Sequence, residues 1–202
     1  MRHPGARRIH AFMDALVGER NTRSLSAEVR GTDSGRARRL LRLLIAGDLL
    51  QAGRIIDAMP ELADVRDENG WTPLFYAVAW GSPALAERLI VSARARVNHR
   101  DACGWSAAME ASRRGELECL AVLIRHGADT SAQSRSGWTA LHEAVVQGDL
   151  SVVRLLLGSG ADRTLTSKAG QTPVDLLESL PHPDPIVGGL RYLLLQWSPG
   201  GP

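Results

Sequence analysis

The chain has 202 residues, enough for one ordinary domain or one short array of repeats, and its apolar fraction of 44% is sufficient for a hydrophobic core. Its net charge of +2 is too small to indicate a class of partner. The sequence contains no run of about 18 apolar residues and no long N-terminal apolar stretch, so it predicts neither a transmembrane helix nor a secretory signal.

Residues 1–35 are expected to form a basic segment ahead of the folded array. Residues 1–39 hold nine Arg and four acidic residues, whereas the remainder holds 15 basic and 18 acidic residues. A short amphipathic helix is predicted over residues 8–18, followed by a polar linker, because its apolar side chains recur every three or four positions: Ile9, Phe12, Met13, Leu16 and Val17. Three roles are open for this helix: docking on the first repeat, binding a partner's groove, or targeting to an organelle.

From about residue 36 onward, glycines recur with one period. Three series share it: Gly70, Gly104, Gly137 and Gly170; Gly47, Gly81, Gly115 and Gly148; and Gly127 and Gly160. Each full period holds two short segments with apolar residues at helical spacing. Because two such helices cannot bury their shared apolar side alone, the period predicts a stack of about five units. We place them at residues 36–66, 67–100, 101–133, 134–166 and 167–197.

The most regular unit lies within residues 137–163. Thr139 can cap a first helix, since its hydroxyl can accept from a free backbone N–H of the first turn. Gly148 permits a tight reversal into a second helix, and Gly160 can end that helix in the left-handed conformation. This unit fixes the register of the other four.

Short motifs in these units resemble a known family. Residues 71–77 (Trp-Thr-Pro-Leu-Phe-Tyr-Ala), 138–144 (Trp-Thr-Ala-Leu-His-Glu-Ala) and, more weakly, 171–174 (Gln-Thr-Pro-Val) resemble the Thr-Pro-Leu-His-x-Ala signature of ankyrin repeats. Residues 126–129 and 159–162 resemble the family's Gly-Ala-Asp helix exit. The resemblance implies an all-α, ankyrin-type solenoid of about five helix-turn-helix repeats joined by β-hairpin-like loops. We assign residues 36–202 to this ankyrin repeat domain.

Both terminal units depart from the pattern. The first has Arg38, Arg39 and two leucines where Thr-Pro is expected, as suits the charged outer face of a terminal cap. The last replaces the tight reversal by the proline-rich residues 181–185 and resumes over residues 186–197. The leucines of this final stretch are expected to cover the last apolar face: Leu190, Leu193 and Leu194.

The second unit has an irregular exit over residues 92–98. It lacks the helix-ending glycine and carries one extra residue. A left-handed residue other than glycine costs about 1 kcal/mol, and the extra residue offers a way to avoid that cost by rerouting the loop. We therefore expect a distorted connection here.

No catalytic or metal-binding constellation emerges from the sequence. The six histidines are scattered, and the spacing of Cys103 and Cys119 fits no metal motif. His142 occupies the family's His position, which implies that its ring ties neighbouring loops together. We expect no enzymatic activity, cofactor, metal or small-molecule substrate. The two free cysteines suit a reducing compartment, hence the cytoplasm, or the nucleus if the organism is a eukaryote.

The remaining candidates for function lie on the surface. In ankyrin-like stacks, loop tips and exposed first-helix positions line one concave side. The partner-binding candidates there are tryptophans and arginines, the residues that dominate binding hot spots: Trp71, Trp80, Arg100, Trp105, Arg113, Arg114, Arg135 and Trp138. Two alternatives stay open. The column Trp71, Trp105 and Trp138 can instead pack over the loop bases, and Arg113–Arg114 can be a merely solvated pair.

We therefore predict a monomeric, non-enzymatic protein–protein interaction module that binds another protein through its concave face as a scaffold, adaptor or regulator. A preformed face loses little conformational freedom on binding. The alternative is a binder of nucleic acid or another anionic surface, which is weakened by the small basic excess and the few interleaved aromatics. It would use Arg2, Arg7, Arg8, Arg36, Arg38 and Arg39.

Overall fold

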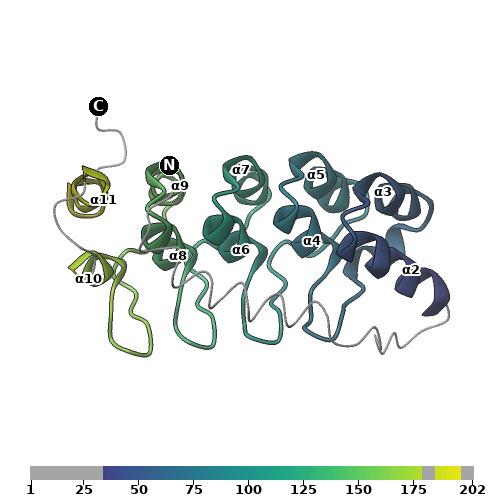
Figure 1. Ribbon diagram of the computed structural model, residues 1–202, viewed down its shortest axis with the longest axis horizontal. Coiled ribbons are helices and arrows are strands. Elements are labelled where there is room, and N and C mark those ends of the chain that lie inside the picture. Colours follow the sequence, from purple (N-terminus) through teal and green to yellow (C-terminus); the bar gives the residue numbers. More distant parts are fainter. Residues whose placement is uncertain (1–33, 179–184, 197–202) are drawn as a thin grey trace.

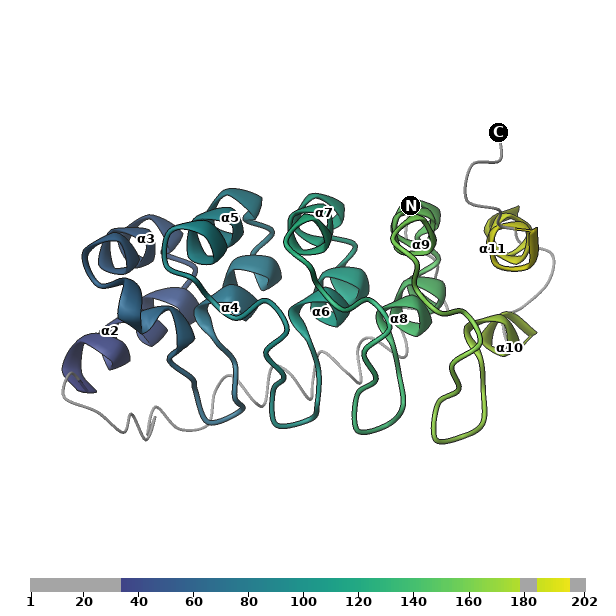
Figure 2. The same cartoon turned by 180° about the vertical axis from the view of Figure 1, so that it is seen from behind.

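The structure, a computed structural model, describes residues 34–178 and 185–196. In these residues, helices form two parallel rows that run the length of the molecule, and long loops project from one row (Figure 1). Figure 2 shows the same two rows from behind. The described part contains ten α-helices and no strand, so the predicted all-α solenoid is confirmed.

The helices alternate between the rows along the chain. The inner row, from which the loops project, contains α2 (Ser34–Ile45), α4 (Pro73–Ala79), α6 (Ala107–Arg114), α8 (Ala140–Gln147) and α10 (Pro173–Glu178). The outer row contains α3 (Leu49–Ala58), α5 (Pro83–Val91), α7 (Leu117–Arg125), α9 (Leu150–Gly158) and α11 (Pro185–Gln196). A short 3₁₀ helix, η1 (Pro60–Asp64), follows α3.

Helix α2 begins at Ser34, slightly before the position where the array was predicted to start. The amphipathic helix predicted over residues 8–18, and the linker up to residue 33, lie outside the described residues. The same holds for residues 181–184 of the proline-rich stretch between α10 and α11.

Side-chain caps explain where several helices start. The Thr139 hydroxyl accepts from the backbone N–H of His142 at 3.4 Å, and the His142 ring accepts in return from the backbone N–H of Thr139 at 3.2 Å. Ser106 caps α6 and Ser82 caps α5, and in each case the serine hydroxyl accepts from a backbone N–H of the first turn. The predicted capping role of Thr139 is therefore confirmed.

All ten glycines of the three periodic series have positive φ angles. The conformation alone favours glycine, and some of the sites are also crowded. A Cβ on Gly137 would lie 2.8 Å from the backbone nitrogen of Lys168, in the next loop. The period in the sequence therefore marks real turns and close loop-to-loop contacts.

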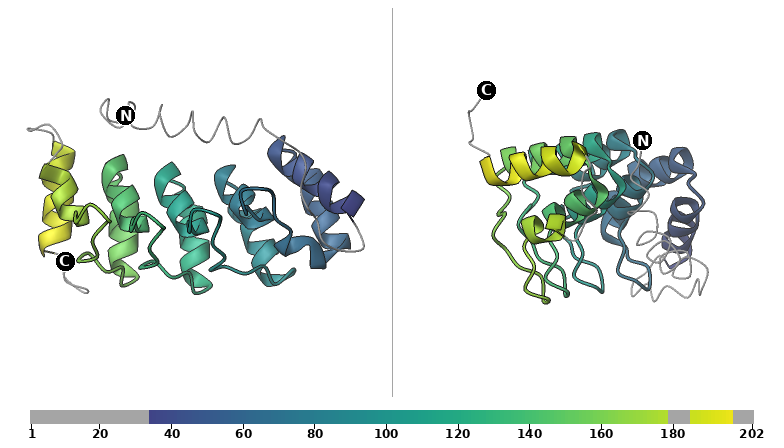
Figure 3. Two further views of the ribbon diagram at one scale, coloured as in Figure 1. Left: turned by 90° about the horizontal axis from the view of Figure 1, so that it is seen from below. Right: turned by 60° about the vertical axis from the view of Figure 1, so that its left-hand side comes forward.

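The projecting loops, called fingers below, are tight turns at residues 67–71, 101–105, 134–138 and 167–171. In each finger the first residue's N–H donates to the carbonyl of the last, as from Asp101 to Trp105 at 2.9 Å. Backbone bonds also join successive fingers, as from the Arg135 N–H to the Cys103 carbonyl at 2.9 Å. The fingers thus form a regular row beside the inner helices, seen from two sides in Figure 3.

The hydrophobic core runs continuously between the two rows. Small and branched residues of the inner helices fill it, including Ala77, Ala111 and Ala144, which allow neighbouring helices to approach closely. At the C-terminal end α11 packs against α9 and α10. The three leucines predicted to cover the last apolar face are buried there: Leu190, Leu193 and Leu194.

The exit of the second unit is irregular, as predicted, but for a partly different reason. The returning N–H of Ala95 bonds to the carbonyl of Leu89, whereas after α7 the N–H of Ala128 bonds to the carbonyl of Leu123, so the loop after α5 encloses one more residue. The extra residue does not avoid the left-handed conformation, because Arg94 has a φ of 56°. That part of the prediction is wrong: the loop absorbs the insertion and still needs one left-handed residue.

Candidate functional site

Trp80 lies at the end of α4, and its ring reaches back to the preceding helix pair. Its indole N–H donates to the backbone oxygen of Leu44 at 2.7 Å. The ring lies over Gly47, where a Cβ would be 3.3 Å from its nearest atoms. The missing side chain makes room for the indole. Trp80 nevertheless remains 51% exposed, so it is held in place and still open to a partner.

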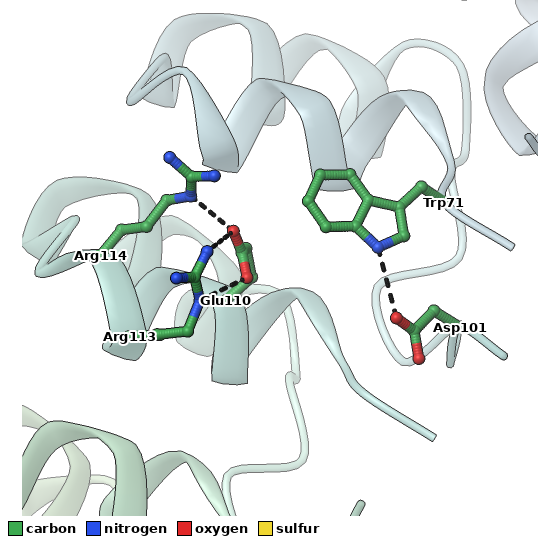
Figure 4. Close-up of polar contacts among 5 residues, drawn as sticks. All are labelled: Trp71, Asp101, Glu110, Arg113 and Arg114. Carbon is green, nitrogen blue, oxygen red and sulfur yellow. Dashed lines mark hydrogen bonds and ion pairs between the residues drawn. The ribbon is translucent and has the colours of Figure 1, made fainter. Parts of the chain in front are cut away.

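Arg113 and Arg114 have different surroundings (Figure 4). The Arg113 guanidinium donates to Glu110 of the same helix through Nε at 3.1 Å and a terminal nitrogen at 2.8 Å. Only 5% of the Arg113 side chain is exposed, so its interpretation as a solvated residue is wrong. Arg114 donates from Nε to Glu110 at 2.5 Å and keeps 32% of its side chain exposed.

Two carboxyl groups are buried near these arginines. Burial alone would raise the pKa of Glu110, but the hydrogen bonds and charges of Arg113 and Arg114 outweigh it and lower that pKa. On α8, burial raises the pKa of Glu143 to about 8, with Arg113 opposing and Glu110 reinforcing the shift. At neutral pH Glu110 is therefore ionised and Glu143 is largely protonated.

Sequence reasoning missed both acids. A signal was present for Glu110, which precedes the two arginines by three and four positions, the spacings that bring helix side chains together. Glu143 offered no comparable signal, because its burial depends on the packing of α6 against α8.

The column Trp71, Trp105 and Trp138 is partly buried, and each ring packs against the core. The Trp71 indole N–H donates to Asp101 of the next finger at 3.3 Å (Figure 4). The Trp138 ring lies with its centroid 5.8 Å from that of His142. These contacts support the packing role that was left open, and a partner contact for this column stays a prediction.

A small hollow of about 80 Å³ opens between α2, the first finger, α4 and α6. Six residues line it: Ile45, Trp71, Tyr76, Ala79, Trp80 and Arg114. The hollow thus brings together three predicted site residues from three different parts of the chain. Sequence reasoning missed Tyr76, whose hydroxyl donates to Asp67 at 2.8 Å. Burial and then the Asp67 carboxylate raise the pKa of Tyr76, so the phenol stays neutral.

The other two predicted arginines lie away from this hollow. Arg100 is exposed, and its guanidinium donates to the backbone oxygen of Gln133, which links the bases of two fingers. Arg135 is exposed on the third finger. Both belong to the finger side of the molecule, so their predicted role in partner binding remains a prediction.

His142 has a structural environment. Its Nε2 donates to the backbone oxygen of Gln171 in the next finger at 3.0 Å, which agrees with the loop-tying role that the family resemblance implied. Burial lowers its pKa, with the Gln171 bond opposing. Within residues 34–178 and 185–196, no group of three or more His, Cys, Asp or Glu side chains could hold a metal ion. No helix in these ranges is long and apolar enough to cross a membrane.

A second, larger groove lies on the outer row between α7 and α9, with a volume of about 730 Å³. Its lining is mainly apolar and includes Leu117, Ala121, Ile124, Leu150 and Leu155. The sequence reasoning considered only the inner side and missed it. A signal existed, because Leu117 and Leu150 recur one period apart, each at the first position of its outer helix.

The alternative of an anionic partner concerns the N-terminal arginines. Arg36, Arg38 and Arg39 are exposed on α2. Arg2, Arg7 and Arg8 lie outside the described residues. The alternative therefore stays a prediction, which steeply salt-dependent binding to random DNA would support.

Comparison with known proteins relates this geometry to one family. The family model "Ankyrin repeats (3 copies)" matches residues 80–167. The chain is 31% identical over 90 residues to 26S proteasome non-ATPase regulatory subunit 10 of Dictyostelium discoideum, covering 45% of this chain and 39% of that protein. It is 35% identical over 99 residues to human Ankyrin repeat domain-containing protein 63, covering 47% and 26%.

A third similarity is to human SH3 and multiple ankyrin repeat domains protein 2, at 38% identity over 74 residues, covering 36% of this chain and 4% of that protein. The matched region therefore spans less than two fifths of the length of each of these relatives. What the rest of each relative does is thus no guide to this chain.

Proposed function

Because this chain is an ankyrin repeat protein, we propose that it binds another protein through the side formed by its fingers and inner helices. Ankyrin repeats are a general protein–protein interaction module, and the family is generally non-enzymatic. The finer proposal is that this chain acts as a monomeric scaffold, adaptor or regulator in the cytoplasm. Its two free cysteines are consistent with a reducing compartment.

The observation that carries the proposal is the hollow between α2, α4 and α6. Trp80 is fixed by its bond to Leu44 and is still half exposed. Arg114 is fixed by Glu110 and is still partly exposed. Large side chains that are ordered before binding lose little conformational entropy when a partner covers them, and Trp and Arg are the residues that dominate binding hot spots.

Capture of partners from a lysate of the source organism, quantified by mass spectrometry, tests this proposal. The double variant Trp80→Ala/Arg135→Ala removes two exposed side chains from the finger side. The matched control Leu117→Ala/Arg125→Ala removes two from the outer helix α7. Arg113 is avoided because it is buried against Glu110.

We expect the wild type and the outer control to capture the same proteins, and the finger-side variant to lose them. Thermal unfolding of both variants must first match the wild type, since Trp80 also contacts α2. If the finger-side variant captured the same proteins at the same level as the wild type, binding through this side would be refuted.

A further inference from the structure

We propose that the hollow between α2, the first finger, α4 and α6 receives the carboxylate of an Asp or Glu side chain from a segment of a partner protein. The inference rests on the proposed function and specifies the chemistry of its partner. It depends on how Arg114 is held, on the charges around it, and on the aromatic walls beside it.

Arg114 is oriented before any partner arrives. Its Nε donates to Glu110, and Figure 4 shows its two terminal nitrogens turned away from that carboxylate. A guanidinium has five N–H donors in a rigid plane, so four remain after the Nε bond. The edge formed by the terminal nitrogens matches a carboxylate in a two-bond, side-by-side arrangement. In the proposed complex, these donors bind the carboxylate that enters the hollow, which Arg114 lines.

Arg114 is the one charged side chain among the six residues that line the hollow. Glu110 is ionised because Arg113 and Arg114 hold its pKa low. Glu143 is largely protonated, because burial raises its pKa to about 8. Two further carboxylates stand nearby but do not line the hollow: Asp67 binds the Tyr76 hydroxyl, and Asp101 binds the Trp71 indole.

The aromatic walls of the hollow strengthen the binding of a carboxylate to Arg114. Trp71, Tyr76 and Trp80 enclose it on the side of α4 and the first finger. Such walls exclude water from an ion pair and raise its strength, since the attraction is screened less than in bulk water. A hollow of about 80 Å³ with a single guanidinium suits one carboxylate, whereas phosphorylated segments are recognised by clusters of arginines.

Panning a phage-displayed library of random dodecapeptides against the full chain tests the proposal. We expect the selected peptides to share an Asp or Glu at one fixed position. A synthetic peptide with the selected sequence is then measured by fluorescence anisotropy against wild type, Arg114→Gln and Arg125→Gln. The last variant removes the same charge from the outer helix α7, and Arg114→Gln leaves the Arg113–Glu110 pair in place.

We expect Arg114→Gln to weaken binding about tenfold or more, and Arg125→Gln to leave it unchanged. Replacing the peptide's acid by its amide should weaken binding to wild type by a similar factor and have little further effect on Arg114→Gln, because both changes remove the same pair. Selected peptides without a shared acid, or equal affinity for wild type and Arg114→Gln, would overturn the inference and leave the proposed function standing.

Two other outcomes would show that the hollow has a different occupant or none. If the full chain enriched no peptide at all, and lysate capture also failed, the inference and the proposed function would fall together. A synthetic peptide of residues 8–20 of this chain, which contains Asp14 and Glu19, is the competitor in the last arm. Displacement of the selected peptide by this competitor would overturn a partner protein as the occupant in favour of the chain's own N-terminal segment.

Discussion

Glu143 is buried on α8, close enough to Arg113 and Glu110 of α6 for their charges to act on its carboxyl. Equivalent positions one and two repeats earlier hold Glu110 and Tyr76, so one buried column contains a neutral phenol, an ionised acid and a protonated acid. Only Glu110 has arginines three and four positions further along its own helix. The same position in the repeat therefore takes different charge states because its neighbours differ.

This arrangement predicts a pH-dependent stability. A carboxyl whose pKa is raised in the folded state stabilises the protein most below its unfolded pKa, and that contribution is lost as pH rises through the folded pKa, here about 8. The lowered pKa values of Glu110 and His142 act in the opposite direction, but only below their ordinary values of 4.5 and 6.5. Between pH 6.5 and 8, Glu143 is therefore the one of these three groups that changes stability.

We expect the free energy of unfolding in urea to fall by up to about 2 kcal/mol from pH 6.5 to pH 8. The variant Glu143→Gln should abolish most of that slope, since an amide does not titrate. Glu118→Gln, which changes an exposed acid on α7, should keep it. A wild type with flat stability over this range, or an unchanged slope in Glu143→Gln, would contradict the assignment of a protonated buried acid.

At the scale of one element, the exit of α5 shows how an insertion is accommodated. Later exits place Gly127 and Gly160 in the left-handed conformation, and Arg94 takes the corresponding place after α5. The backbone bond from Ala95 to Leu89 survives with one more residue enclosed than in the exit after α7. The repeat keeps its hydrogen bond and accepts local strain, because the buried Ala95 must still reach the core.

Replacing the strained residue should stabilise the protein. Arg94→Gly removes the cost of about 1 kcal/mol that a left-handed residue other than glycine carries. Glycine also makes the unfolded chain more flexible, which offsets part of this gain, so we expect the free energy of unfolding to rise by about 0.5 kcal/mol. For an array of this size that gain corresponds to a rise of roughly 1–2 °C in Tm, measurable by calorimetry.

The matched control is Gly127→Ala, at the equivalent position after α7. A Cβ there would have no atom within 4 Å, so only backbone strain acts, and we expect a loss of about 1 kcal/mol. A lower Tm for Arg94→Gly would mean that the Arg94 side chain contributes more than its backbone costs.

At the scale of the whole molecule, each helix pair packs chiefly against its neighbours, so the ends require separate protection. α11 supplies it at the C-terminal end by burying Leu190, Leu193 and Leu194 against the preceding pair. Leu195 of the same helix is 57% exposed, so one side of α11 faces the array and the other faces solvent. α11 is thus part of the array's core.

Substitutions on the buried and exposed sides of α11 should show whether this helix stabilises the rest of the array or is only attached to it. Leu190→Ala creates a cavity at a fully buried position and should cost about 2–5 kcal/mol, seen as a lower urea midpoint of the main transition. Leu195→Ala, on the exposed side, should cost less than about 1 kcal/mol. If Leu190→Ala left the main transition unchanged, α11 would not stabilise the rest of the array.

The sequence alone predicted the period, the helix pairs, the ten turn glycines and the C-terminal leucines. These features follow from local rules that recur along the array, because a positive φ favours glycine and a shared apolar side requires a neighbour to cover it. Thr139 likewise indicated the start of its helix.

Only the tertiary structure decided which of the predicted surface residues are available to a partner. Arg113 and Arg114 are adjacent in the sequence, yet the first is buried against Glu110 and the second lines a hollow with Trp71 and Trp80. The groove between α7 and α9 also appears only when the outer helices are packed. The exposure of Trp80 and the charge state of Glu143 depend on neighbours that belong to other repeats, and the spacing of residues within one repeat does not reveal those neighbours.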